Sequence, residues 1–419
     1  MILQEVIVRR KDIDSYRKIV GDEVIDELKT LSKPLEGKRL IHINSTARGG
    51  GVAEILASLV PLQRNLGLDA RWFVASPPAP FFKITKKFHN ALQGADIPIS
   101  EEELNYYLKF NQQFAEAVEL LPADLLLIHD PQPLALRHYS DRDTPAISRI
   151  HIDLSTPSPS LLKFFLPFLN EYDRVIFSLS SFVPEGFPKE KVAVIPPAID
   201  PRLPKNKKLD EKLAKMILTG FGVNPTEPII AQASRFDPWK DPIGVIDAYR
   251  VAKKEIPDLQ LILLGSMAAK DDPEAAVIFR QVRDYMGKDR DISLIFRPAY
   301  FHGRVNDLVL NAVQSGADVI LQKSLREGFG LTATEALWKG KPVIAGRVGG
   351  LALQIEDGES GVLVNNSEDA GRAIVRVLKD KKLKEDLGRA AHERVLKNFL
   401  ITRLIRDHHR LYREVLGLV

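Results

Sequence analysis

The stretch ADVILQKSLREGFGLTATEALWKGKPVIA, residues 317–345, predicts a strand, a helix and a second strand. Its two apolar runs, Ala317–Leu321 and Pro342–Ala345, are short and rich in valine, isoleucine and leucine, as in strands buried on both faces. Leu331–Lys339 has helical periodicity between them. A helix that crosses between two such strands is the repeating unit of a parallel sheet, so the stretch predicts an α/β fold.

The same alternation extends over the rest of the chain. Other short apolar runs predict strands at Arg39–Asn44, Ala70–Ala75, Asp124–His129, Ala146–Ile150, Arg174–Leu179, Val192–Ile195, Pro228–Ser234, Leu259–Leu264, Ile292–Phe296 and Gly361–Val364. Amphipathic runs predict helices at Val52–Leu66, Glu101–Leu121, Leu161–Tyr172, Ile243–Lys254, Pro273–Met286, Val305–Ser315, Glu368–Lys379 and Lys384–Lys397. The chain therefore predicts two doubly wound α/β domains, each with a mainly parallel sheet.

The boundary between the two halves is marked by proline and lysine. Four prolines between residues 196 and 204 lead into Lys205–Lys208, which cannot be a central strand. We place the junction within residues 200–226, with a first domain of 1–215 and a second of 216–399. A final helix from Thr402 could cap either half, and we expect residues 400–419 to return to the first. In such sheets ligands bind beyond the carboxyl ends of the strands, so we expect the two domains to face a central cleft.

Composition excludes several classes of protein. The 419 residues contain no cysteine, which excludes disulfide scaffolds, cysteine-ligated zinc, iron–sulfur clusters and thiol catalysis. The net charge is +4 with both signs mixed along the chain, so we expect no nucleic-acid partner. A basic C-terminal run carries leucine and isoleucine at helical spacing, which favours a docked helix. No apolar run approaches a membrane span and no targeting signal is visible, so we expect a cytoplasmic protein.

A glycine-rich turn follows the first predicted strand. Gly49, Gly50 and Gly51 open the helix that begins near Val52, and such a turn lets an anion or a sugar approach the backbone. Dinucleotide binding fits poorly, because the third glycine of G-x-G-x-x-G falls on Glu54 and no acid follows the next strand. A glycine turn that serves packing alone stays open.

Histidine and aspartate follow two other strands of the first half. His129-Asp130-Pro131-Gln132-Pro133 comes after one and His151-Ile152-Asp153 after the next. Either histidine alone is more often structural, but the repeated pairing favours side chains that line a cleft. No H-E-x-x-H spacing occurs, so we expect no catalytic zinc.

In the second half, cations and acids follow two strands. Arg235 and Lys240 lie on a loop where they could converge on one polyanion, although surface cations are often simply solvated. Gly328 and Gly330 expose the helix N-terminus at Leu331, which predicts an anion site. Glu327 and Glu335 flank that site and suit ligand hydroxyls, while Glu335 alone could be an exposed helix acid. A glycoside hydrolase would also use two carboxylates, but it explains the cations and glycines less well.

These residues resemble a known family. Arg235 and Lys240, followed by Glu327 and Glu335 in an E-x7-E arrangement around G-F-G-L, resemble the donor site of retaining nucleotide-sugar glycosyltransferases of the GT-B fold, family four. The strings at 44–54, 129–133, 151–153 and 235–240 are similar to those of the trehalose-forming synthases. Trehalose phosphorylases share several of these strings and remain an alternative, as do sucrose- or glycogen-type synthases.

The resemblance implies transfer of glucose from NDP-glucose to glucose, which yields α,α-trehalose with retention of the donor configuration. It implies four catalytic residues: His151, Arg235, Lys240 and Glu327. It implies a donor site in which Glu327 holds the glucose, Glu335 holds the ribose, and the diphosphate contacts Arg235, Lys240 and the backbone of Phe329, Gly330 and Leu331. Gly328 belongs to the same site, and Gly50 and Gly51 approach the diphosphate or the donor sugar. It places the acceptor at Asn44, Asp130, Gln132 and Asp153.

The remaining expectations concern cofactors and partners. We expect no tightly bound cofactor and no protein metal site, although Mg²⁺ could stimulate the reaction. The partners are sugars and nucleotide sugars, without a membrane, and a homodimer is compatible with the chain. Contacts to the base are expected from backbone at Gly265–Met267 and in the loop Arg297–Val305.

Overall fold

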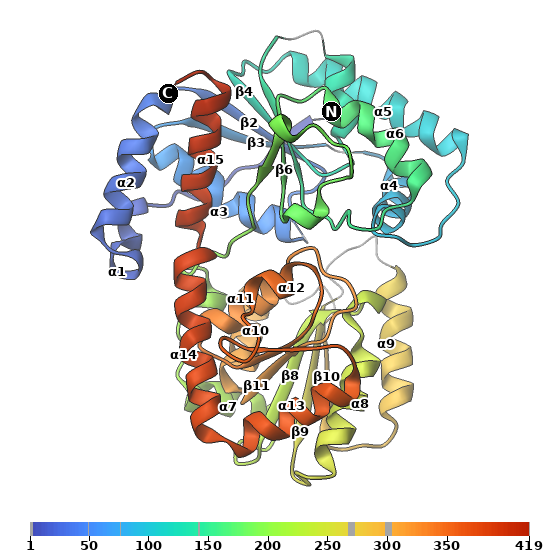
Figure 1. The fold of residues 1–419 in the computed structure, drawn as a ribbon, viewed down its shortest axis with the longest axis vertical. Coiled ribbons are helices and arrows are strands. Elements are labelled where there is room, and N and C mark those ends of the chain that lie inside the picture. The colour runs from blue at the N-terminus through green and yellow to red at the C-terminus, as the bar shows by residue number, and fades with distance from the viewer. Residues whose placement is uncertain are drawn as a thin grey trace. The chain divides into compact units, whose positions relative to one another are not determined.

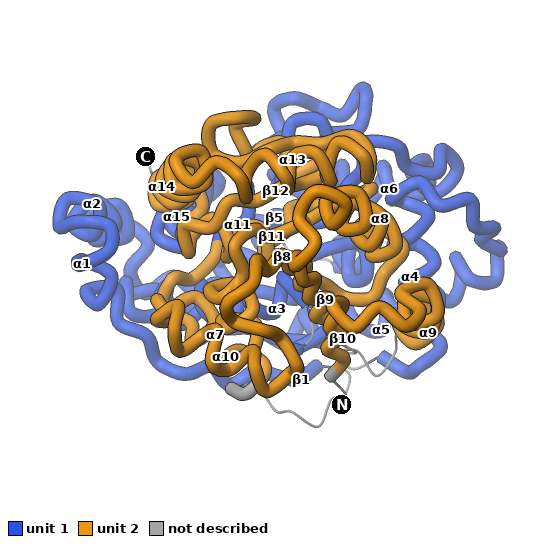
Figure 2. The backbone as a smooth tube through the Cα atoms, turned by 90° about the horizontal axis from the view of Figure 1, so that it is seen from below, with its two compact units in different colours: residues 1–198, 401–419 blue, residues 199–400 orange. Residues whose placement is uncertain are grey.

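The structure is a computed structural model that describes residues 3–48, 50–75, 77–140, 143–266, 273–297 and 304–418. The chain forms two compact units (Figure 1, Figure 2). Unit 1 contains residues 1–198 and 401–419, and unit 2 contains residues 199–400. The chain therefore returns to the first unit for its last helix.

Unit 1 is built on a seven-stranded sheet in the order β1-β3-β2-β4-β5-β6-β7. The strands are β1 (Leu3–Glu5), β2 (Arg39–Asn44), β3 (Asp69–Ala75), β4 (Leu125–His129), β5 (Ala146–Ile150), β6 (Arg174–Phe177) and β7 (Val192–Val194). All neighbours are parallel except β1, which pairs antiparallel with β3. The direction of strand progression reverses between β2 and β4, which creates a topological switch point there.

Helices cover both faces of this sheet (Figure 1). They are α1 (Arg17–Val20), α2 (Asp22–Ser32), α3 (Gly51–Asn65), α4 (Ala79–Leu92), α5 (Glu101–Glu119), α6 (Pro159–Asn170) and α15 (Ile401–Val415). α4, α5 and α6 pack together around an aromatic cluster that includes Phe81, Phe88, Tyr107 and Phe165. α15 packs against α2 and α3 and buries an apolar stripe with Leu404 and Ile405, as its helical spacing predicts.

Unit 2 has a six-stranded parallel sheet in the order β10-β9-β8-β11-β12-β13. The strands are β8 (Ile229–Arg235), β9 (Gln260–Ser266), β10 (Ile292–Arg297), β11 (Val319–Gln322), β12 (Val343–Gly346) and β13 (Val362–Val364). The helices are α7 (Glu211–Thr219), α8 (Pro242–Lys253), α9 (Pro273–Met286), α10 (Arg304–Gly316), α11 (Leu331–Trp338), α12 (Gly349–Gln354), α13 (Ser367–Lys379) and α14 (Lys381–Asn398). The switch point of this sheet lies between β8 and β11.

The α/β class and the strands predicted from sequence are confirmed, with strand ends that agree to within two residues. The sequence pattern did not predict β1, the helices between Arg17 and Ser32, α4 or α12. β1 is a three-residue edge strand that is only partly buried, so it carries too few residues for an apolar alternation. α4 begins beside Pro77, Pro78 and Pro80. A cluster of prolines indicates a loop, but proline is also accepted in the first turn of a helix.

Candidate functional site

The switch point of unit 2 brings the two predicted post-strand segments together. Lys240 follows β8 and Glu327 follows β11, and their Nζ and Oε2 atoms lie 2.5 Å apart. Both side chains are largely buried, with exposed fractions of 16% and 9%. The hydroxyl of Ser324 donates to the same Oε2 at 3.1 Å. A buried cation and a buried carboxylate therefore meet where an α/β sheet binds its ligand.

Gln232 holds the loops after β8 and β11 in place. Its amide nitrogen donates to the backbone oxygen of Lys240 at 2.9 Å, and its amide oxygen accepts from the backbone N–H of Lys323 at 3.2 Å. The Lys323 ammonium is ion-paired with Asp241, which caps α8 by accepting from the N–H of Gly244. The predictions from sequence missed Gln232, Lys323 and Asp241. Gln232 could have been found, because a glutamine inside an apolar strand needs a partner.

Arg235 is more open than Lys240. Its guanidinium donates to Asp237 at 3.3 Å, and its side chain is 41% exposed. Asp237 also accepts from the backbone N–H of Trp239 at 2.9 Å, which fixes the turn that carries Lys240. The structure thus places the two predicted cations on one turn with different exposure.

The glycine-flanked helix N-terminus is present. α11 begins after Gly330, whose φ of 90° lies in the left-handed region that glycine adopts readily. A Cβ at Gly330 would lie 2.9 Å from Leu351 and 3.1 Å from Glu327. The backbone oxygen of Phe329 accepts from Gln354, which further holds the loop. The first N–H groups of a helix lack partners within the helix, so Leu331 begins a segment suited to an anion.

Glu335 is fully buried in α11 rather than an exposed helix acid. Its carboxylate lies 2.5 Å from the ammonium of Lys205, which comes from the segment before α7. Burial raises the pKa of Asp307 in α10, the positive charge of Lys205 opposes that shift, and the negative charge of Glu335 adds to it. The predictions from sequence missed Lys205 and Asp307, since Lys205 was placed only in the boundary segment between the two domains.

The switch point of unit 1 carries His129, the last residue of β4, and Asp130, the residue after it. Asp130 has a φ of 65°, a left-handed conformation that is uncommon for a residue other than glycine. Its carboxylate accepts from the backbone N–H of His151 at 2.8 Å, which ties the end of β4 to the end of β5. Burial raises the pKa of Asp130 to about 7, against the opposing effects of that hydrogen bond and of the Arg149 charge.

The other predicted acceptor residues make local contacts. Asn44 accepts from the indole N–H of Trp72 at 2.7 Å and donates to the backbone oxygen of Thr46 at 2.8 Å. Asp153 accepts from the N–H of Ser155 at 2.8 Å. The amide oxygen of Gln132 is buried and has no hydrogen-bond partner among the described residues. Within the described ranges, the amide oxygen of Gln132 is thus a buried acceptor without a partner, while the carboxylate of Asp153 keeps its second oxygen, for which no hydrogen bond is recorded.

In the glycine turn, Gly50 precedes the first residue of α3, Gly51, and a Cβ at Gly50 would have no atom within 4 Å. Gly49 lies outside the described residues. So do Met267 and the loop 298–303, where contacts to the base are expected. Within the described ranges no three His, Asp or Glu side chains are grouped as a metal site, and no helix is long and apolar enough to cross a membrane.

Comparisons with known proteins place this chain in a family. Residues 42–184 match the family described as "Trehalose synthase, N-terminal domain", and residues 219–394 match "Glycosyl transferases group 1". The chain is 45% identical to a trehalose synthase of Thermococcus litoralis over 408 residues, 97% of each chain. It is 43% identical to a trehalose synthase of Rubrobacter xylanophilus over 421 residues, 99% of this chain and 100% of the other.

A solved structure supports the fold. The trehalose-6-phosphate synthase OtsA superposes with a TM-score of 0.73 at 15% identity, over 91% of this chain and 99% of the other. The predicted GT-B fold is thereby confirmed. The chain therefore belongs to the trehalose synthase family of group 1 glycosyltransferases.

Proposed function

We propose that this glycosyltransferase moves glucose from an NDP-glucose to the anomeric oxygen of a second glucose, forming α,α-trehalose and NDP. The observation that carries the proposal is the buried Lys240–Glu327 pair at the switch point of unit 2. A cation stabilises a diphosphate, and a carboxylate accepts hydrogen bonds from sugar hydroxyls. Lys240 supplies the cation and Glu327 the carboxylate, side by side. Near full-length similarity to trehalose synthases supports glucose as the acceptor.

In this proposal the donor binds in unit 2. Lys240 and Arg235 hold the diphosphate together with the backbone of Gly328, Phe329, Gly330 and Leu331. The family resemblance also assigns Gly50 and Gly51 to the donor. Glu327 accepts from the glucose hydroxyls. Glu335 accepts from the ribose hydroxyls while Lys205 neutralises its charge.

The chemistry then follows from charge. The bond between the anomeric carbon and the diphosphate oxygen breaks, and the acceptor oxygen attacks the same face of the sugar. The acceptor's proton passes to the departing phosphate oxygen, so no protein base is required. Fixed cations and helix N–H groups stabilise the charge that develops on the leaving oxygen, a contribution of about 3–4 kcal/mol for each well-placed donor.

Unit 1 supplies the sugar contacts. The family resemblance assigns His151 to the donor glucose and Asp130, Gln132, Asp153 and Asn44 to the acceptor. The amide oxygen of Gln132 has no partner among the described residues, but it is buried by protein atoms, so the side chain must move before a sugar hydroxyl can reach it. Asn44 already bonds Trp72 and Thr46, which leaves one hydrogen of its amide nitrogen and one lone pair of its amide oxygen for a sugar.

The experiment is a product assay by NMR. The chain is incubated with UDP-, ADP- or GDP-glucose and ¹³C-labelled glucose, with and without Mg²⁺. We expect a 1,1-linked disaccharide with one label for each NDP released. No such product from any of the three donors would refute the proposal.

A trehalose phosphorylase is the second candidate, because it shares several of the first-half motifs. The two activities are separated by supplying trehalose with inorganic phosphate and, separately, with NDP. Consumption of trehalose with NDP alone supports the synthase, while consumption with phosphate alone supports the phosphorylase.

A further inference from the structure

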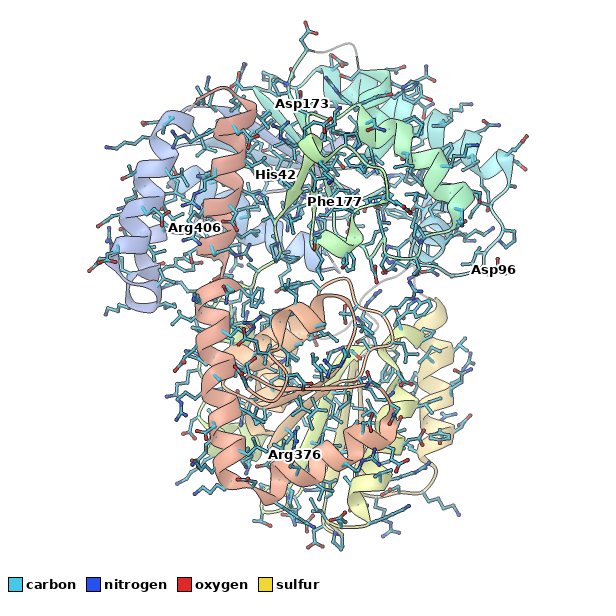
Figure 3. The ribbon with its side chains drawn as sticks, viewed as in Figure 1. His42, Asp96, Asp173, Phe177, Arg376 and Arg406 are labelled. Carbon is cyan, nitrogen blue, oxygen red and sulfur yellow. The ribbon has the colours of Figure 1, made fainter. Side chains whose placement is uncertain are left out.

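A continuous chain of buried hydrogen bonds ends at His151. His151 Nε2 lies 3.1 Å from His129 Nδ1, and His129 Nε2 lies 3.0 Å from His42 Nδ1. Neighbouring rings lie edge to edge, with centroids 5.3 and 5.4 Å apart and planes inclined by 23° and 24°. His42 Nε2 then lies 3.0 Å from the side-chain amide of Gln63. Figure 3 labels His42 in this part of the molecule.

The chain continues into the last helix of unit 1. The amide of Gln63 lies 3.3 Å from the hydroxyl of Tyr412, and that hydroxyl lies 2.6 Å from His408 Nδ1. His408 Nε2 accepts from the guanidinium of Arg149, which also donates to the backbone oxygen of Ile195. The side chains of His42, Gln63, His129, Arg149, His408 and Tyr412 are all at most 2% exposed.

Arg149 sets the direction of this chain, because a guanidinium can only donate. His408 must therefore accept at Nε2. Burial holds the pKa of His408 well below its ordinary value, so the ring is neutral and carries its single proton on Nδ1. His408 Nδ1–H thus donates to the hydroxyl of Tyr412.

The hydroxyl hydrogen of Tyr412 then requires an acceptor. His408 cannot provide one, since its Nδ1 is protonated, so the acceptor is the amide oxygen of Gln63. The amide oxygen of Gln63 faces His42 in the structure, and its nitrogen faces Tyr412. The hydrogen-bond chain requires the opposite orientation, which a half-turn of the amide group gives. Without that half-turn, a buried hydroxyl hydrogen would have no partner, which costs about 1–3 kcal/mol.

The direction propagates to the switch point. The amide nitrogen of Gln63 donates to His42 Nε2, so His42 donates from Nδ1 to His129, and His129 donates from Nδ1 to His151 Nε2. Burial holds the pKa of His42 at about 4, and the pKa values of His129 and His151 also lie well below the ordinary value. Each ring therefore carries one proton, as the chain requires.

We propose that the chain from Arg149 through His408, Tyr412, Gln63, His42 and His129 fixes His151 as a neutral Nδ1–H tautomer, which binds its ligand as a hydrogen-bond donor. Among the described residues no hydrogen bond is made by His151 Nδ1. The matching ligand atom is an oxygen that accepts a hydrogen bond, such as a sugar hydroxyl or ring oxygen. The one lone pair of His151, on Nε2, is then occupied by His129 and is not free for general-base chemistry, and the six other residues are positioning residues.

The tautomer can be measured directly on the ligand-free full chain. Long-range ¹H–¹⁵N NMR of ¹⁵N-histidine-labelled protein distinguishes protonated from unprotonated ring nitrogens, and His151→Asn identifies the His151 signals. We expect protonated Nδ1 and unprotonated Nε2 for His151, His129 and His42. A protonated Nε2 at His151, a charged ring at neutral pH, or averaging between the two tautomers would overturn the proposal.

Two variants test whether the chain is the cause. Gln63→Glu replaces the amide by a carboxylate that only accepts, so His42 must donate from Nε2 and the signals of His151 Nδ1 and Nε2 should exchange character. Tyr412→Phe cuts the chain, and the His151 signals should shift toward averaging. If both variants fold and keep the wild-type pattern, the chain does not set the tautomer.

Tyr172→Phe is the matched control. Tyr172 is also fully buried in unit 1, and its hydroxyl donates to the backbone oxygen of Leu134 at 2.6 Å, outside the chain. It should lose stability without moving the His151 signals. The identity of the ligand that His151 binds rests on the proposed function, but the tautomer of His151 is measured without substrate. Failure of trehalose synthesis and failure of the tautomer assignment are therefore separate results.

Discussion

Replacing Lys240 by methionine removes one partner of the buried pair and leaves the carboxylate of Glu327 alone. At the separation of 2.5 Å the attraction is about 7 kcal/mol for an effective dielectric constant of about 20. Much of that attraction offsets the cost of desolvating both charges. Breaking such a pair at one end typically costs about 3–5 kcal/mol, and we expect about 3 because the lysine is 16% exposed.

Two assays separate stability from catalysis. Urea denaturation should show the loss of stability in Lys240→Met, and turnover of NDP-glucose should fall about 100- to 1,000-fold, as for loss of one charge-stabilising donor. Adding Glu327→Gln removes the uncompensated charge and should restore most of the stability but none of the turnover. A double variant as unstable as the single one, or a single variant with wild-type turnover, would refute the reasoning.

Lys384→Ala is the control for this experiment. Lys384 pairs with Asp318 at 2.9 Å just before β11, at the opposite end of the strand from Glu327, so turnover should not change. Burial raises the pKa of Asp318, but hydrogen bonds from Lys384 and the N–H of Ile229 outweigh it and lower the pKa below 3.8. A lowered carboxyl pKa stabilises the fold above the unfolded pKa. Lys384→Ala should therefore be less stable than wild type at neutral pH, and this difference in unfolding free energy should vanish as pH falls through the pKa of Asp318 in the folded protein.

Three further outcomes are expected. Glu335→Gln should weaken NDP binding more than binding of inorganic diphosphate, as measured by calorimetry; equal losses would contradict its ribose role. Burial raises the pKa of Asp130 to about 7, so its contribution to stability is full below pH 3.8 and is lost as pH rises to 7. Above pH 7 we therefore expect Asp130→Asn to be more stable to urea than wild type, by up to about 4 kcal/mol. At pH of about 4 the two proteins should be equally stable. Gly330→Ala should lose about 1–2 kcal/mol from its left-handed backbone and more from the contact with Leu351, whereas Gly358→Ala, with a φ of 80° and no atom within 4 Å, should lose only the backbone part.

Much of the fold could be predicted because its signals are local. Of the thirteen strands that the structure describes, twelve are short apolar runs between helical periodicities, and this alternation alone specifies parallel sheets. The candidate donor residues could be proposed for a related reason. Arg235 ends a strand, Lys240 and Glu327 each follow one, and in a parallel sheet those ends share one edge.

The partners of these residues depend on the tertiary structure. Lys205 reads as part of a solvated linker, yet it is ion-paired with the buried Glu335 130 positions further along the chain. Likewise, His408 lies in a helix whose periodicity shows only that one face is buried. That this face meets Arg149, 259 positions earlier, follows from the return of α15 to unit 1.

Apolar burial is nondirectional and roughly additive, so its pattern can be read from neighbouring residues. A hydrogen bond or an ion pair requires two particular atoms at one distance and angle, and a buried polar group is costly without them. Sequence therefore determines which segments form strands and helices and which of their ends carry charge. Only the assembled structure decides which buried groups meet, and with them the direction of the hydrogen bonds that reach His151.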